Sequence, residues 1–83
     1  MTRLRFFAAL REQLGVGDEQ IVLPDNIGDV AGLTDWLRSR SGVWNEALAN
    51  QQLRVAVNQV VVRPDAPVQD GDEVAWFPPV SGG

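Results

Sequence analysis

The chain has 83 residues, a formal net charge of −4 at pH 7, and neither cysteine nor histidine. A chain of this length folds as one small domain with a modest core. The lack of cysteine excludes disulfides, thiolate metal sites and a cysteine nucleophile, and the lack of histidine removes the commonest general base and metal ligand. We therefore expect no catalysis by the isolated chain, and no metal or cofactor bound to it.

All seven basic residues are arginines, and they are scattered along the chain rather than gathered in a stripe. Binding to nucleic acid is therefore not expected. The apolar runs are only a few residues long, far shorter than a membrane span. The first five residues, Met1–Arg5, lack the apolar core of a secretory signal. We expect a cytoplasmic protein that does not contact a membrane.

The first half of the chain predicts two strands followed by the main helix. Alternation of polar and apolar residues predicts a strand over 2–7, and a short helical turn over 8–14 ends at Gly15. A second strand is predicted over 20–23. The main helix is predicted over 29–40, with Asp29 as its N-cap and an apolar stripe of Val30, Leu33, Trp36 and Leu37.

The second half predicts a short helix and then several strands. The short helix covers 44–49, a hairpin with Asn58-Gln59 at its turn joins strands 54–57 and 60–62, and a turn at 70–72 precedes a last strand over 73–77. This order predicts an α+β fold, a mixed sheet with one main helix packed across one face. The first and last strands are expected to be central, parallel neighbours, joined by the long crossover.

The sequence ends in Gly82-Gly83, after an apolar lead-in that contains Pro78 and Pro79. Two residues without Cβ can enter a narrow channel and leave a terminal carboxylate unhindered for reaction with an activated phosphate. The two prolines fix two φ angles and end the last strand. We therefore expect two parts, a folded domain and an extended tail with the reacting carboxylate of Gly83: residues 1–77 and residues 78–83.

Three apolar residues occupy the outward phase of predicted strands, where polar residues are expected. Phe7 is in phase with the arginines at positions 3 and 5, Val61 with Arg63, and Phe77 with Glu73. An outward apolar cluster indicates an interface. The alternative is that the strand ends twist and bring these residues to the edge of the core.

Two further groups of residues have a structural and a functional interpretation. Trp36 and Trp44 are interpreted as core or core-rim residues rather than as a cofactor contact. Asp70, Asp72 and Glu73 could form a metal cluster, but a turn followed by a solvated strand edge is the favoured interpretation.

Five motifs lie along the whole chain: Phe6-Phe7-Ala8, Leu10-Arg11-Glu12, Val57-Asn58, Asp70-Gly71-Asp72-Glu73-Val74 and Phe77-Pro78-Pro79-Val80-Ser81-Gly82-Gly83. Together they resemble the small subunit of molybdopterin synthase, the ubiquitin-like sulfur carrier often called MoaD. The last strand and the tail that follows it form the specific part, because many carriers share a diglycine end. The resemblance implies a β-grasp fold, which agrees with the predicted order of elements.

The resemblance also implies a function. An adenylyltransferase similar to ubiquitin-activating enzymes would use MgATP to convert the Gly83 carboxylate into an acyl-adenylate, and sulfur transfer would give a thiocarboxylate. The tail would then enter a pocket of the large synthase subunit, in a heterotetramer, and donate sulfur to the pterin precursor. The resemblance assigns the reacting end to Gly82 and Gly83, and the partner contact to Phe7, Val61, Phe77, Pro78, Pro79, Val80 and Ser81.

Three alternatives remain at the level of sequence. The sulfur carrier of thiamine synthesis shares the diglycine end, although those chains are typically shorter and lack the Phe-Pro-Pro lead-in. A protein-conjugating modifier like ubiquitin would form isopeptides on target lysines. The third alternative is a passive β-grasp interaction module.

Overall fold

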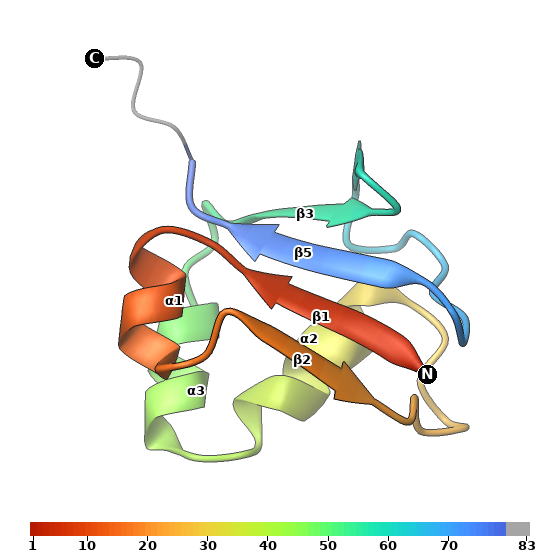
Figure 1. Ribbon diagram of the computed structural model, residues 1–83, viewed down its shortest axis with the longest axis horizontal. Coiled ribbons are helices and arrows are strands. Elements are labelled where there is room, and N and C mark those ends of the chain that lie inside the picture. Colours follow the sequence, from red (N-terminus) through yellow and green to blue (C-terminus); the bar gives the residue numbers. More distant parts are fainter. Residues whose placement is uncertain (80–83) are drawn as a thin grey trace.

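The computed structural model describes residues 1–79, and within that range the chain forms five strands and three helices (Figure 1). In chain order these are β1 (Thr2–Phe6), α1 (Ala9–Leu14), β2 (Asp18–Ile21), α2 (Val30–Arg38), α3 (Gly42–Leu48), β3 (Arg54–Val57), β4 (Val60–Val62) and β5 (Glu73–Phe77).

The strands form one mixed sheet in the order β2-β1-β5-β3-β4. β1 and β5 are parallel, with Leu4 opposite Val74 and Phe6 opposite Trp76, whereas the other pairs are antiparallel. A parallel pair needs a long crossover, which here contains all the intervening elements. The helices cover one face of the sheet (Figure 1). The predicted α+β fold, with parallel inner first and last strands, is confirmed.

The core lies between the sheet and α2. Leu4, Phe6, Val74 and Trp76 project from β1 and β5 toward the helices, and all are at most 1% exposed. From α2, the predicted apolar stripe contributes fully buried residues such as Leu33. The indole Nε1 of Trp76 donates to Thr34 Oγ1 at 3.0 Å, so the largest core residue buries no unsatisfied donor.

Asp29 caps α2 as predicted, because its carboxylate accepts a hydrogen bond from the Gly32 backbone N–H at 2.7 Å. The cap also explains a glycine inside the helix. A Cβ at Gly32 would lie 3.0 Å from Asp29 Oδ1, so a side chain there would press against the capping carboxylate. α2 ends at Arg38, two residues before the predicted end. α3 begins at Gly42, two residues before the predicted start, with Ser41 as its N-cap.

The second strand differs from the prediction, since β2 covers Asp18–Ile21 rather than 20–23. The reason is its pairing with β1, in which Ile21 lies opposite Thr2 and Asp18 opposite Arg5. Residues after Ile21 run past the amino end of β1 and have no strand to pair with. Val22 is accordingly 73% exposed.

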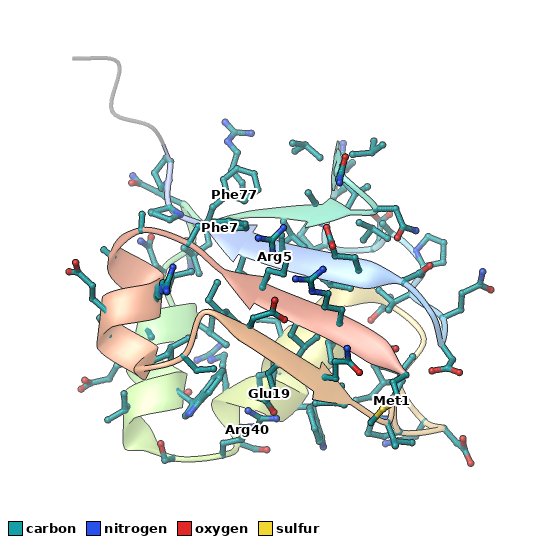
Figure 2. The ribbon with its side chains drawn as sticks, viewed as in Figure 1. Met1, Arg5, Phe7, Glu19, Arg40 and Phe77 are labelled. Carbon is teal, nitrogen blue, oxygen red and sulfur yellow. The ribbon has the colours of Figure 1, made fainter. Side chains whose placement is uncertain are left out.

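The two tryptophans assigned to the core rim are there. Trp36 and Trp44 are half-buried and pack against the core, and Trp44 meets the ring of Phe6 edge-on with centroids 5.3 Å apart. The guanidinium of Arg40 stacks on both indoles, at 5.1 Å and 4.7 Å, and pairs with the Glu19 carboxylate of β2 at 2.6 Å. Figure 2 shows Glu19 and Arg40 facing each other below β2. This contact fastens the helices to the sheet edge.

The acidic residues before β5 form a turn. Asp72 accepts hydrogen bonds from Asn58 Nδ2 and from the Gln69 backbone, and Asp70 pairs with the Met1 α-amine at 3.2 Å. Among residues 1–79, no three acidic side chains gather in a way that could hold a metal ion. In the same range, no helix has the length and apolar character needed to cross a membrane.

Candidate functional site

The face of the sheet opposite the helices is called the open face here. Strand alternation and the pairing register assign ten strand residues to it. They combine charged and polar residues near the β2 edge with small and apolar residues and one arginine toward β4: Arg3, Arg5, Asp18, Gln20, Arg54, Ala56, Val61, Glu73, Ala75 and Phe77.

Phe7 and Phe77, called the aromatic pair here, are neighbours in register where β1 and β5 end. The Phe7 N–H donates to the Trp76 carbonyl at 3.2 Å, which continues the parallel register by one residue and brings Phe7 beside Phe77. Figure 2 shows the two residues side by side, at the end of the sheet where the chain leaves β5. Phe7 is 38% exposed and Phe77 is half-buried. On the opposite face, Phe6 stacks on Trp76 with ring centroids 5.3 Å apart.

Val61 extends this apolar surface across the sheet. It is 56% exposed and lies opposite Ala56, which in turn lies opposite Ala75 beside Phe77. The two alanines are only 7% and 8% exposed, so they form the covered floor between the aromatic pair and Val61. We call these five residues the docking face: Phe7, Ala56, Val61, Ala75 and Phe77.

The predicted outward positions of Phe7, Val61 and Phe77 are therefore confirmed. The alternative, in which twisted strand ends bring them into the core, does not hold for Phe7 and Val61, whose side chains remain exposed. Their contact with a partner stays a prediction.

Pro78 and Pro79 follow directly on β5 without secondary structure. Pro78 is half-buried and lines a hollow of about 270 Å³ together with Leu10 of α1 and Ala47 of α3. Pro79 is exposed. The chain thus leaves the domain beside the aromatic pair. The remaining predicted site residues lie outside the described residues: Val80, Ser81, Gly82 and Gly83.

The charges near the β2 edge are paired with each other. Arg3 Nε donates to Asp18 Oδ1 at 3.1 Å, and Arg3 Nη1 lies 3.6 Å from Glu73 Oε1. The hydrogen bond from Arg3 holds the pKa of the Asp18 carboxyl below its ordinary value, and the same contact raises the pKa of Arg3. Both strand carboxylates of the open face are therefore engaged by one arginine.

Comparison with known proteins identifies the family. The profile of the ThiS family matches residues 4–83, nearly the whole chain. The chain belongs to the ThiS family. The molybdopterin synthase sulfur carrier subunit of Escherichia coli (strain K12) is 40% identical over 83 residues and covers all of both chains. The subunit of the same name from Haemophilus influenzae (strain ATCC 51907 / DSM 11121 / KW20 / Rd) is 37% identical with the same coverage.

The fold of this ThiS-family chain also has solved counterparts. SAMP1 from Haloferax volcanii superposes with a TM-score of 0.75 and is 26% identical, and the match covers 99% of this chain and 98% of that one. The family resemblance inferred from the sequence motifs is confirmed, and so is the ubiquitin-like β-grasp fold.

Sequence reasoning missed the arginines that surround the docking face. The Arg5 guanidinium lies over the Phe7 ring, 4.9 Å from its centroid. Arg54 lies opposite Phe77, and with Arg63 it lines a hollow of about 340 Å³ that Val61 also borders. Strand alternation assigns Arg54 to the open face, but only the strand order brings it next to Phe77.

Proposed function

We propose that this chain is the sulfur carrier subunit of a molybdopterin synthase. The observation that carries the proposal is the full-length relationship to proteins of that name, which extends through Gly83. The aromatic pair of Phe7 and Phe77, at the foot of the same tail, supports it. In this proposal the folded domain docks on the partners and positions the tail, and the terminal carboxylate is the reacting group.

The proposed chemistry begins by activating the Gly83 carboxylate, which is a poor electrophile. In an adenylyltransferase, a carboxylate oxygen attacks the α-phosphorus of MgATP, pyrophosphate leaves, and an acyl-adenylate forms. A donor at the oxidation level of sulfide then forms a C–S bond as the C–O bond to AMP breaks, with no net redox change. The product is a thiocarboxylate, and the activating partner supplies the acid and base groups.

The second proposed partner is the large subunit of the synthase, in a heterotetramer with two carriers. The docking face would seat on that subunit while the tail enters its active site. Docking makes sulfur transfer to the pterin precursor effectively intramolecular, and the extended prolines reduce the entropy lost on threading. Once the thiocarboxylate sulfur has bonded to the pterin precursor, water would cleave the acyl–sulfur bond. The sulfur would stay on the pterin and the Gly83 carboxylate would return for the next round, so two rounds supply two sulfurs. Because the cycle uses ATP, we place it in the cytoplasm.

The decisive measurement is the intact mass of the chain after incubation with an adenylyltransferase, MgATP and a sulfide source. We expect replacement of one oxygen by sulfur, and no such change when Gly83 is deleted. Fragment ions must assign the change to Gly83, because oxidation of Met1 or a tryptophan adds nearly the same mass. A wild-type chain that is adenylated but never gains sulfur would contradict the proposal.

The alternatives predict other outcomes of the same experiments. A protein modifier would form isopeptide adducts with target lysines. A thiamine-pathway carrier would gain sulfur but would restore thiazole synthesis rather than pterin sulfuration. If the chain is a passive module, deletion of Gly83 should leave the rate of pterin sulfuration unchanged.

A further inference from the structure

Two arginines continue the docking face at the end of the sheet where the tail begins. Across this end, the strand order places Phe7, Phe77, Arg54 and Arg63 in succession. Arg54 lies directly opposite Phe77, and Arg63 follows β4 in the same phase as Val61. Both arginines are exposed, and both line the hollow of about 340 Å³ beside Val61.

Neither arginine is neutralised by a carboxylate within residues 1–79. Arg54 and Arg63 make no ion pair with any carboxylate of residues 1–79. This holds although Asp65 lies only two residues from Arg63. The carboxylates that the strands place on the open face, Asp18 and Glu73, both pair with Arg3.

This local positive charge contrasts with the net charge of −4. Exposed charges act over only about 8–10 Å at moderate salt, so a partner close to Arg54 and Arg63 meets a positive surface. Docking on the adjacent apolar face would remove water from both guanidinium groups. A desolvated charge without a partner is strongly unfavourable, whereas a guanidinium matched by a carboxylate forms two parallel hydrogen bonds.

We propose that the protein surface that binds the docking face carries carboxylates opposite Arg54 and Arg63, and that this pairing selects the partner. The inference rests on the proposed function, which makes that protein the large synthase subunit. The partner surface is thus apolar, with carboxylates along the border that faces the β3–β4 end of this sheet. This pairing adds charge specificity to an otherwise apolar contact.

The test measures the dissociation constant of the full-length chain with the purified large subunit of the same organism, between about 50 and about 500 mM NaCl. Arg54→Gln and Arg63→Gln are compared with Arg38→Gln, which removes the same charge from α2, on the helix side of the sheet. We expect about fivefold weaker binding for each docking-face variant at low salt, and more than tenfold for the double variant. The salt dependence should become shallower in these variants, and Arg38→Gln should stay within about twofold of wild type.

The outcomes separate this inference from the proposed function. If wild type binds, but Arg54→Gln and Arg63→Gln bind equally well at every salt concentration, the pairing with partner carboxylates is wrong and the carrier function stands. An equal loss of affinity in Arg38→Gln would show that the effect comes from net charge alone, and this would also overturn the inference. If wild type does not bind the large subunit at all, the docking step of the proposed function fails. Thermal unfolding of each variant verifies that it is folded.

A second arm addresses small anions. Inorganic phosphate is added at constant ionic strength, and its effect on binding is compared with that of chloride. Equal effects support pairing with protein carboxylates. Specific competition by phosphate, lost in Arg54→Gln, would show a small-anion site and would overturn the proposal.

Discussion

At the scale of single residues, Phe6 and Phe7 show how one step along a strand changes the role of a side chain. Phe6 points toward the helices, is 1% exposed, and lies between Trp44 and Trp76. Phe7 points to the open face and is 38% exposed. At Ala8 the backbone turns with a positive φ of 55° into α1, so Phe7 remains at the end of the sheet.

This difference predicts two unlike alanine variants. Phe6→Ala should lower the free energy of unfolding by about 3–5 kcal/mol, because it removes the centre of an aromatic cluster. Phe7→Ala should cost less, about 1–2 kcal/mol, because 38% of its surface stays exposed in the fold, yet it should weaken binding to the large subunit. Urea denaturation followed by circular dichroism measures the first quantity, and titration calorimetry the second. An equal stability loss in both variants would assign Phe7 to the core instead of the docking face.

Asp18 predicts a pH dependence of stability. Arg3 lowers the pKa of Asp18 in the folded state, so the ionised carboxylate favours folding. Its contribution is complete above the ordinary carboxyl pKa of about 4 and is lost as the pH falls through the lower folded pKa. The stability difference between wild type and Asp18→Asn should therefore be constant from neutral pH to about pH 5 and shrink below about pH 4.

Urea midpoints across this pH range measure the effect of Asp18. The control is the same substitution in an Arg3→Gln background, where the stability difference caused by Asp18→Asn should no longer shrink at low pH. A difference that persists unchanged into acid would show that the ion pair does not act on folding.

At the scale of elements, the β3–β4 hairpin combines a demanding turn with a tie to the rest of the sheet. Asn58 and Gln59 have φ values of 51° and 70°, the left-handed region that two-residue hairpin turns require. The Asn58 side chain accepts from the Glu73 backbone N–H and donates to Asp72, both at 3.0 Å. Asparagine at position 58 is therefore favoured both by its tolerance of a positive φ and by its two side-chain hydrogen bonds. Gln59 has the strained positive φ without such hydrogen bonds among residues 1–79.

Replacing Gln59 should thus stabilise the protein. We expect Gln59→Gly to raise the free energy of unfolding by about 0.5–1 kcal/mol, because glycine adopts the left-handed conformation without steric cost. The measurement is chemical denaturation, and the control is Gln52→Gly, an exposed turn residue without a positive φ. A loss of stability in Gln59→Gly would mean that its side chain makes a contact that outweighs the backbone strain.

At the scale of the whole molecule, the parallel pairing of β1 and β5 determines where the tail begins. Both strands end at the same side of the sheet, beside α1, and the amino terminus lies at the opposite side (Figure 1). The end of β1 supplies Phe7 next to the last strand residue, Phe77. The docking face thus lies next to the point at which the chain leaves the domain.

Most elements could be predicted because their signals are local. The bounds of β3, β4 and β5 agree with the prediction, since alternation and turn residues define them. β2 was placed two residues late because its ends depend on pairing with β1, which local patterning does not contain. For the same reason the sequence indicated Phe7, Val61 and Phe77 separately, while the two alanines between them appeared only with the sheet order.

By itself, the sequence determined the α+β class, the capped main helix, the outward phase of three apolar residues and the family, because each depends on neighbouring residues or on motifs. Only the tertiary structure decided which of those residues meet. It joined Phe7 to Phe77 through the parallel pair and placed Arg54 beside them. It also left Arg54 without a carboxylate among residues 1–79, since Asp18 and Glu73 are engaged by Arg3. Residues far apart in the chain become neighbours through strand order and register, and those are properties of the folded sheet.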